Sequence, residues 1–144
     1  MSETATEREV MEYEVIIVGA GPAGLACAIR LKQLKPDLMV AVIEKSAEVG
    51  AHILSGAVIE PGPLDELLPG WKDNPPPVCI PVEDDEIVFL TAKSRQKLPT
   101  PPQQKNHGNF IVSLGALCAW PVSYTHLRAH ETVVRISYAV FCLK

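Results

Sequence analysis

Runs of apolar residues along the first fifty positions have the spacing of a strand, a helix and a second strand. Residues 13–18 include a β-branched apolar run, as a strand buried in a parallel sheet requires. Residues 25–35 carry apolar side chains at helical spacing, and Pro36 ends that pattern. Residues 39–43 form a second apolar run, which ends at Glu44. This order predicts a βαβ unit with two parallel strands, and therefore an α/β fold.

A glycine-rich turn with the pattern G-x-G-x-x-G separates the first predicted strand from the helix. Gly19 permits a tight turn, Gly21 lets the backbone approach a pyrophosphate, and Gly24 lets the helix pack closely on the sheet. Free N–H groups at the start of the helix then face the phosphates, where the helix dipole favours negative charge. The predicted phosphate-binding residues are Gly19, Ala20, Gly21, Pro22, Ala23 and Gly24.

An acidic residue completes this pattern at the end of the second strand. Glu44 lies 20 residues after Gly24, where a carboxylate can accept hydrogen bonds from an adenosine ribose. A glycine-rich turn alone often has only a structural role. Here the first strand, the helix, the second strand and the acidic residue all stand in the order that a dinucleotide-binding unit requires. The pattern predicts a Rossmann-like, FAD- or NAD(P)-binding domain. It does not separate FAD from NAD, because both cofactors present an ADP half.

The middle of the chain is rich in proline and predicts fewer regular elements. Residues 73–104 hold most of these prolines, and residues 86–91 read as a single strand. The acid run at 83–86 is best explained as a solvated turn, because metal ligands must converge rather than merely follow one another. A helix is expected after Ser113.

Composition and charge narrow the possible partners and location. The 144-residue chain is 47% hydrophobic with a formal net charge of −4, which gives no reason to expect nucleic acid as a partner. Residues 1–12 read as a flexible N-terminus that has neither the layout of a secretion signal nor that of a transit peptide. We therefore expect the chain to begin in a bacterial-type cytoplasm. The four cysteines include no C-x-x-C pair.

Two longer stretches resemble one flavoprotein family. GAHILSGAV at 50–58 and NHGNFIVSLG at 106–115, together with VIEKSAEVG at 42–50, resemble the electron transfer flavoprotein–ubiquinone oxidoreductase family over residues 13–120. The resemblance implies FAD, with residues 19–24 at the pyrophosphate and Glu44 at the ribose. It also implies a loop near the flavin. The further cofactor-binding residues expected on this basis are Lys45, Leu54, Ser55 and Gly56.

The resemblance also implies an enzyme of respiratory electron transport. Such proteins pass electrons from reduced electron transfer flavoprotein to ubiquinone, using FAD and a 4Fe-4S iron-sulfur cluster. They are monotopic on the membrane surface: the cytoplasmic side of the bacterial inner membrane, or the mitochondrial inner membrane in eukaryotes. We expect the cluster ligands and the quinone site to be absent from this chain. We predict no catalytic residue, and interpret His52 as a loop histidine rather than a proton donor.

Residues 51–71 resemble the part of the family that enters the membrane surface. Leu64, Leu67, Leu68 and Trp71 follow the spacing of an amphipathic helix, and tryptophan favours the lipid boundary. The alternative is a helix packed on the core, and the acidic residues between the leucines favour that alternative.

Other functions remain compatible with part of the pattern. A geranylgeranyl reductase or a monooxygenase would share the glycine turn and the acid, but not the two longer stretches. A non-catalytic nucleotide-binding module would be complete at 144 residues.

The last residues have a different origin in our interpretation. Residues 122–132 match the in-frame translation of a transposase adapter used for sequencing libraries, and residues 136–144 match the flow-cell end of that adapter. The alternative is a natural strand preceded by a helix whose His126 and His130 bind a metal. We favour a non-native tail at 122–144 and assign no metal ligand. Residues 13–121 are then a truncated FAD-binding domain with an incomplete parallel sheet, expected to be inactive and unstable alone.

Overall fold

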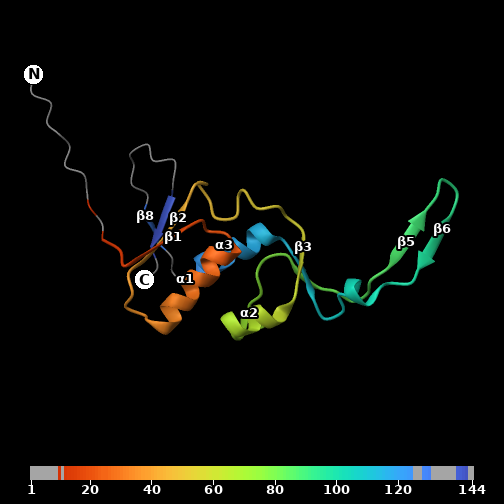
Figure 1. The fold of residues 1–144 in the computed structure, drawn as a ribbon, viewed down its shortest axis with the longest axis horizontal. Helices are drawn as coiled ribbons and strands as arrows, with labels where there is room; N and C mark the ends of the chain where they lie inside the picture. The colour runs from red at the N-terminus through yellow and green to blue at the C-terminus, as the bar shows by residue number, and fades with distance from the viewer. Residues whose placement is uncertain (1–9, 11, 125–127, 131–138, 143–144) are drawn as a thin grey trace, which may run out of the picture.

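The predicted βαβ unit is present in the computed structural model of the chain, which describes residues 10, 12–124, 128–130 and 139–142. Strands β1 (Val15–Val18) and β2 (Val40–Glu44) pair in parallel, and helix α1 (Pro22–Leu34) connects them (Figure 1). The α/β class is therefore confirmed. Helix α1 begins three positions before the predicted start, because proline at the first helical position has the φ angle that a helix needs.

Helix α1 packs its apolar side on one face of the β1–β2 pair. Val15 and Ile17 of β1 point to this face, while Ile16 and Val18, on the opposite face, are 57% and 84% exposed. The buried cluster that joins helix and sheet consists of Ala20, Leu25, Ala28, Val40, Val42 and Cys118.

A second, antiparallel sheet follows the βαβ unit. Its strands β3 (Ala57–Ile59), β7 (Phe110–Val112) and β4 (Cys79–Pro81) lie in the order β3-β7-β4. Helix α2 (Pro61–Leu67) and a 3-10 turn, η1 (Trp71–Asp73), follow β3. These short pieces replace the single amphipathic helix predicted over 64–71.

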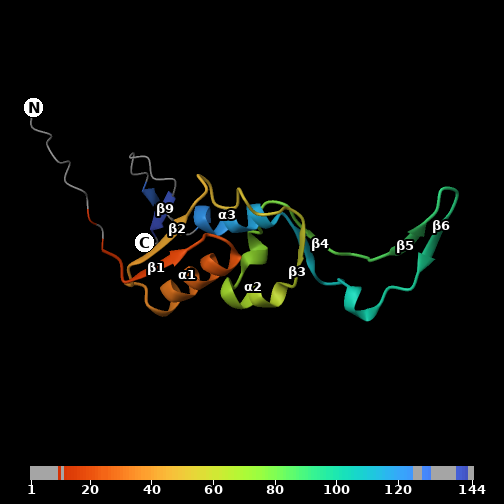
Figure 2. The same ribbon diagram turned by 45° about the horizontal axis from the view of Figure 1, so that its top comes forward.

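The helix expected after Ser113 is α3 (Leu114–Tyr124). It follows β7 directly and returns the chain to the βαβ unit, where it lies alongside α1 (Figure 2). Its Cys118 is 2% exposed and belongs to the buried cluster of α1 and β2. Helix α3 therefore fixes the second sheet against the first.

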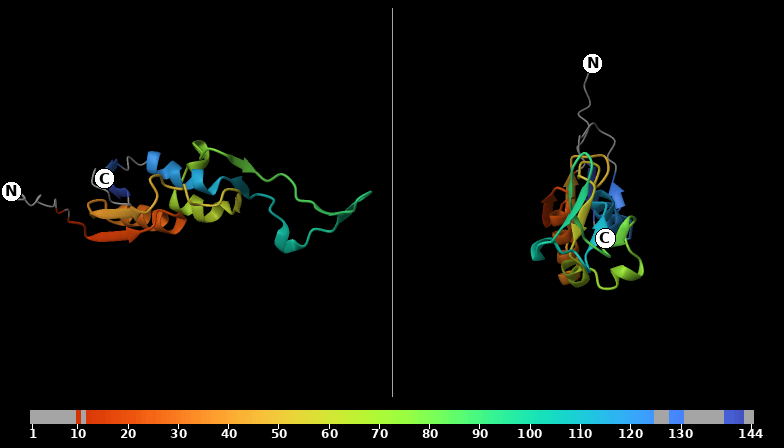
Figure 3. Two further views of the ribbon diagram at one scale, coloured as in Figure 1. Left: turned by 90° about the horizontal axis from the view of Figure 1, so that it is seen from above. Right: turned by 90° about the vertical axis from the view of Figure 1, so that its right-hand side faces the viewer.

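A long hairpin projects from this body. Strands β5 (Ile87–Leu90) and β6 (Arg95–Leu98) pair antiparallel, and a 3-10 turn, η2 (Pro102–Gln104), follows them. Strand β5 corresponds to the strand predicted at 86–91. The hairpin extends away from the other elements in Figure 1 and in the left-hand view of Figure 3. Its Phe89 and Leu90 are 58% and 71% exposed.

Part of the predicted non-native tail forms strands at the outer edge of β2. Strand β9 (Ala139–Cys142) pairs antiparallel with β2, and β8 (Arg128–His130) pairs with β9. The sheet order is β1-β2-β9-β8, so β1 is an edge strand. Most of the predicted N-terminal segment 1–12 and much of the tail, His126 included, lie outside the described residues. His130 lies in a strand rather than on a helix.

Candidate dinucleotide-binding site

The glycine turn between β1 and α1 has the backbone geometry that its sequence predicts. Gly19 has a φ angle of 101°, and its N–H donates to the carbonyl of Ile43, 2.7 Å away, which joins the turn to β2. A Cβ at Gly24 would lie 2.0 Å from the carbonyl oxygen of Gly19. No other amino acid fits there without displacing backbone, so Gly24 sets the close packing of α1 on the turn.

The outer side of the same turn is open. A Cβ built on Gly21 would meet nothing within 4 Å, and Pro22 and Ala23 beside it are exposed. The N–H groups in the first turn of a helix have no partner within the helix. The turn therefore leaves both the space and the donors that a pyrophosphate needs, as a dinucleotide cradle must.

Glu44 connects the turn to the loop that follows β2. Its Oε2 accepts a hydrogen bond from the backbone N–H of Ala20 at 2.8 Å, and its Oε1 accepts one from the N–H of Ser46 at 3.0 Å. The Ser46 and Ala20 N–H groups lower the pKa of the Glu44 carboxyl, so this group is charged at neutral pH. A carboxylate has about four lone-pair sites, which leaves capacity to accept from ribose hydroxyls.

The loop after β2 is held by side chains that the sequence interpretation did not select. Ser46 is 5% exposed, and its hydroxyl lies 3.1 Å from Nδ1 of His52. Ser55, one of the predicted cofactor residues, donates from its hydroxyl to that of Ser113 at 3.3 Å. Ser46 lies two residues after Glu44, at which β2 ends, and this nearness to the acidic strand end is a usable signal. Nothing local indicates Ser113, because it is 58 positions from Ser55.

The predicted site residues thus fall into two groups in space. The turn at 19–24 and Glu44 meet at the carboxyl end of β1 and β2, through the bond from Ala20. Leu54 and Ser55 lie farther along the loop beside the start of α3, and Leu54 is 89% exposed. Lys45 is exposed next to Glu44. The first group fits the ADP half of a dinucleotide.

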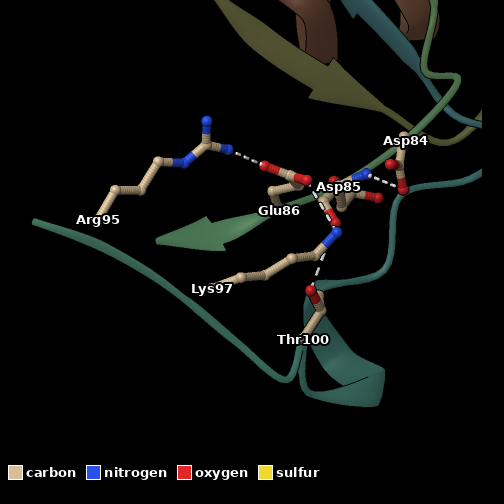
Figure 4. Close-up of polar contacts among 6 residues, drawn as sticks. All are labelled: Asp84, Asp85, Glu86, Arg95, Lys97 and Thr100. Atoms are coloured by element: carbon tan, nitrogen blue, oxygen red, sulfur yellow. Dashed lines mark hydrogen bonds and ion pairs between the residues drawn. The ribbon is translucent and has the colours of Figure 1, made fainter. Parts of the chain in front are cut away.

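The acid run at 83–86 serves structural contacts. Asp85 accepts from the backbone N–H of Asn106 at 2.7 Å and from its side-chain amide at 3.0 Å, and these bonds lower the pKa of Asp85. Glu86 forms ion pairs with Arg95 and Lys97 across the hairpin (Figure 4). Among the described residues, no three His, Cys, Asp or Glu side chains converge to hold a metal ion.

Trp71 points inward rather than toward a lipid boundary. It is 3% exposed, and its ring meets that of Phe110 edge-on at a centroid distance of 5.2 Å. Its Nε1 donates to Asp65 at 2.7 Å. The tryptophan that supported a membrane segment at 51–71 is therefore a packing residue. In the described part of the chain, no helix combines the length and apolar character needed to span a bilayer.

The chain is similar to a protein family and to several known proteins. The Thi4 family, which is characterised by an FAD-binding Rossmann-type domain, matches residues 2–60. The chain is 52% identical over 118 residues to a probable electron transfer flavoprotein-ubiquinone oxidoreductase, mitochondrial, of Schizosaccharomyces pombe. It is 52% identical over 122 residues to the electron transfer flavoprotein-ubiquinone oxidoreductase of Pseudomonas aeruginosa, and 48% identical over 120 residues to the mitochondrial protein of that name in Homo sapiens.

These matches cover most of this chain but a small part of each relative. Each of the three covers 79% of the chain, and the chain spans only 19%, 22% and 19% of the relatives' lengths. The resemblance found in the two longer sequence stretches is thereby confirmed as homology.

Proposed function

Because this chain is homologous to electron transfer flavoprotein-ubiquinone oxidoreductases, with about half of the matched residues identical, we propose that it is the N-terminal FAD-binding part of such an enzyme. The whole enzyme would take electrons from reduced electron transfer flavoprotein and pass them to ubiquinone. The chain alone would be inactive, because it spans about a fifth of its relatives.

One observation carries the proposal of a bound dinucleotide: the Glu44 carboxylate and the glycine turn are joined into a single cradle. The choice of FAD over NAD rests on the homology. The Ala20–Glu44 bond holds the turn beside the strand end, and Gly21 leaves its outer side open. The pyrophosphate would lie on the first turn of α1, and the adenosine ribose against Glu44. Leu54, Ser55 and Gly56 would face the flavin half from the following loop.

Flavin exchanges one or two electrons, which suits a link between single-electron carriers and a two-electron quinone. The residues of this chain would bind and orient that group rather than transfer protons to a substrate. Helix α1 supplies backbone donors and Glu44 supplies an acceptor. His52, whose ring is engaged by Ser46, would hold the loop.

The iron-sulfur cluster and the quinone site belong to the proposal for the whole enzyme. Of the described cysteines, Cys27 is exposed, Cys79 is half-buried and Cys118 is buried in the core. Burial raises the pKa of the Cys79 and Cys118 thiols, which opposes the thiolate form that iron requires. We place the cluster ligands outside this chain.

We place membrane-surface contact at the β5–β6 hairpin. Phe89 and Leu90 are exposed near its tip, and Lys93, Arg95 and Lys97 lie close to them; Glu86 pairs with the last two, so the group keeps a net positive charge. Exposed apolar side chains next to basic ones suit the surface of an anionic bilayer. The enzyme would be peripheral on the inner membrane, facing the cytoplasm in a bacterium.

Flavin titration of the chain tests the FAD proposal. We expect saturable FAD binding that ADP competes away and that Glu44→Ala abolishes. Extending the coding sequence past Trp120 tests the whole function, because the longer protein should contain a four-cysteine cluster motif and reduce ubiquinone with electron transfer flavoprotein as donor. A longer protein without the cysteine motif would favour a reductase or monooxygenase instead.

A further inference from the structure

Two glycines bring the loop after β2 into backbone contact with the first turn of α3. A Cβ at Gly50 would lie 2.4 Å from the carbonyl oxygen of Gly115, and a Cβ at Gly115 would lie 2.9 Å from the carbonyl oxygen of Gly50. Gly50 also has a φ angle of 88°, which disfavours any side chain. Therefore only glycine fits at position 50 and at position 115 without displacing the backbone.

The contact continues an existing strand pairing. The loop enters β3 and α3 leaves β7, and these strands pair with Ala57 opposite Val112. Just beyond the paired strands, the hydroxyls of Ser55 and Ser113 are 3.3 Å apart. The two segments thus stay together from the ladder to the glycine pair, through 50–57 on one side and 112–115 on the other.

Both partners of this contact are fixed to the nucleotide-binding unit. Cys118, one turn after Gly115, is buried in the cluster that contains Ala20 of the glycine turn. Val49 and Ile53 of the loop pack against the same cluster. The position of the loop is therefore set relative to the phosphate turn through α3 as well as through Glu44.

The loop also occupies the place where it would meet a ligand. In open α/β sheets, dinucleotides lie along the carboxyl ends of the strands. The loop leaves that edge immediately after Glu44, and its first residues are tied to Glu44 by the N–H of Ser46. Gly50 and Ser55, farther along the loop, lie beside the start of α3.

We propose that Gly50 and Gly115 are positioning residues, which hold the loop at 50–56 against the half of the bound dinucleotide beyond the pyrophosphate. This inference rests on the proposed function. It assigns α3 a role in setting the depth of the flavin end of the site.

The variant Gly115→Ala tests the contact in the full chain, with Gly62→Ala as the matched control. Both glycines lie in the first turn of a helix, where alanine is normally favoured, but a Cβ at Gly62 meets nothing within 4 Å. Amide hydrogen exchange of the ligand-free chain should show faster exchange at 46–56 in Gly115→Ala and unchanged exchange in α1. FAD affinity should fall by about tenfold, and ADP affinity by less than about twofold.

Unchanged exchange at 46–56, or an equal loss of FAD and ADP affinity, would overturn the inference, since either outcome means that the glycine pair does not act on the flavin end. If Gly115→Ala does not fold, Ser113→Ala removes the hydroxyl pair without adding a clash and should give the same selective pattern more weakly. If the unsubstituted chain binds neither nucleotide, the proposed function fails, while the exchange result still decides whether the glycine pair holds the loop.

Discussion

At the scale of single residues, the site depends on groups that act on backbone rather than on other side chains. Gly24 admits the carbonyl of Gly19, and Glu44 binds the N–H groups of Ala20 and Ser46. Each of these contacts fixes the path of a turn or loop at the strand ends. Substitution there should therefore affect the shape of the site more than its charge.

Replacement of Gly24 by alanine should disrupt the turn. The added Cβ would lie 2.0 Å from a backbone oxygen, which no rotation can relieve. We expect a loss of about 2 kcal/mol or more in the free energy of unfolding, together with loss of FAD binding. Urea denaturation and flavin titration measure these effects, and Gly62→Ala, which has open space, should match the unsubstituted chain in both. A Gly24→Ala variant with normal flavin affinity would contradict the close-packing role.

Replacement of Glu44 by glutamine should weaken cofactor binding and loosen the contact between the turn and the loop, because the amide can accept from only one of the Ala20 and Ser46 N–H groups. The amide keeps one acceptor oxygen but loses the charge that strengthens hydrogen bonds from Ala20, Ser46 and the ribose. We expect FAD affinity to fall by about tenfold, equivalent to ~1.4 kcal/mol. Fluorescence quenching of FAD measures the change. Unaltered affinity would mean that Glu44 holds the turn without touching the ribose.

The same variant should change how stability depends on pH. The pKa of Glu44 is lowered from its ordinary value of 4.5 in the folded chain. Its stabilising contribution is therefore present above 4.5 and is lost as the pH falls through the lower, folded pKa. Between about pH 6 and about pH 3 the unsubstituted chain should lose more stability than Glu44→Gln. Urea midpoints at several pH values provide the comparison, and parallel curves would contradict it.

At the scale of elements, α2, η1 and β7 are joined by one tryptophan, whereas the hairpin stands apart. Trp71 packs on Phe110 and donates to Asp65, so it ties the segment after β3 to the middle strand of the second sheet. The hairpin residues Phe89 and Leu90 have no such burial. Mutation of Trp71 should therefore lower stability, whereas mutation of Phe89 and Leu90 should lower binding to a membrane surface.

Trp71→Ala should destabilise the second sheet. Loss of a buried tryptophan side chain costs about 3–5 kcal/mol, and Trp71→Phe should cost less because it keeps the apolar contact and loses mainly the bond to Asp65. Equilibrium denaturation monitored by circular dichroism measures both variants. Equal stability of Trp71→Ala and the unsubstituted chain would contradict the inward placement.

The double variant Phe89→Ser, Leu90→Ser should lose affinity for anionic vesicles while its circular dichroism spectrum stays unchanged. These side chains are exposed on a projecting hairpin, so their replacement removes apolar surface without opening the core (Figure 3). Co-sedimentation with vesicles of phosphatidylglycerol and phosphatidylcholine measures the affinity. Trp71→Phe is the control and should bind vesicles normally. If Trp71→Phe lost vesicle affinity and the double variant kept it, the membrane contact would lie at 51–71.

At the scale of the whole molecule, the parallel sheet is open. Strand β1 is an edge strand among the described residues, and Ile16 and Val18 are exposed on the face opposite α1. Parallel sheets normally have both faces covered, because their strands are apolar on both sides. The chain also spans only about a fifth of the length of its relatives.

Residues 1–121 expressed alone lack β9, which pairs with β2, so they should unfold over a broader denaturant range than the 144-residue chain and bind more of an apolar dye such as anilinonaphthalene sulfonate. The open edge and the exposed isoleucine and valine are the physical cause. Thermal and urea denaturation, with dye fluorescence, test this expectation. A 1–121 monomer that unfolds as cooperatively as the 144-residue chain and binds no dye would show that the chain needs no further strands.

The amino-acid sequence by itself determined the βαβ unit, the cradle and the homology. Those features are local: a β-branched run, six residues of turn, a helix and an acid at the next strand end lie within the first fifty residues. These features depend on backbone sterics and on hydrogen bonds within this short segment, so the residue order is sufficient to predict them. The start of α1 at Pro22 differs from the expected position only by three residues.

Only the tertiary structure decided how the distant segments meet. The Gly50–Gly115 contact and the Ser55–Ser113 pair join positions about 60 residues apart, and no local pattern encodes which loop lies beside which helix. The spacing of Leu64, Leu67 and Trp71 was compatible with a lipid surface, although by itself it favoured a helix packed on the core. In the fold, Trp71 packs against the ring of Phe110. The sequence pattern does not show this contact, because the burial of a side chain depends on which partner the fold places opposite it.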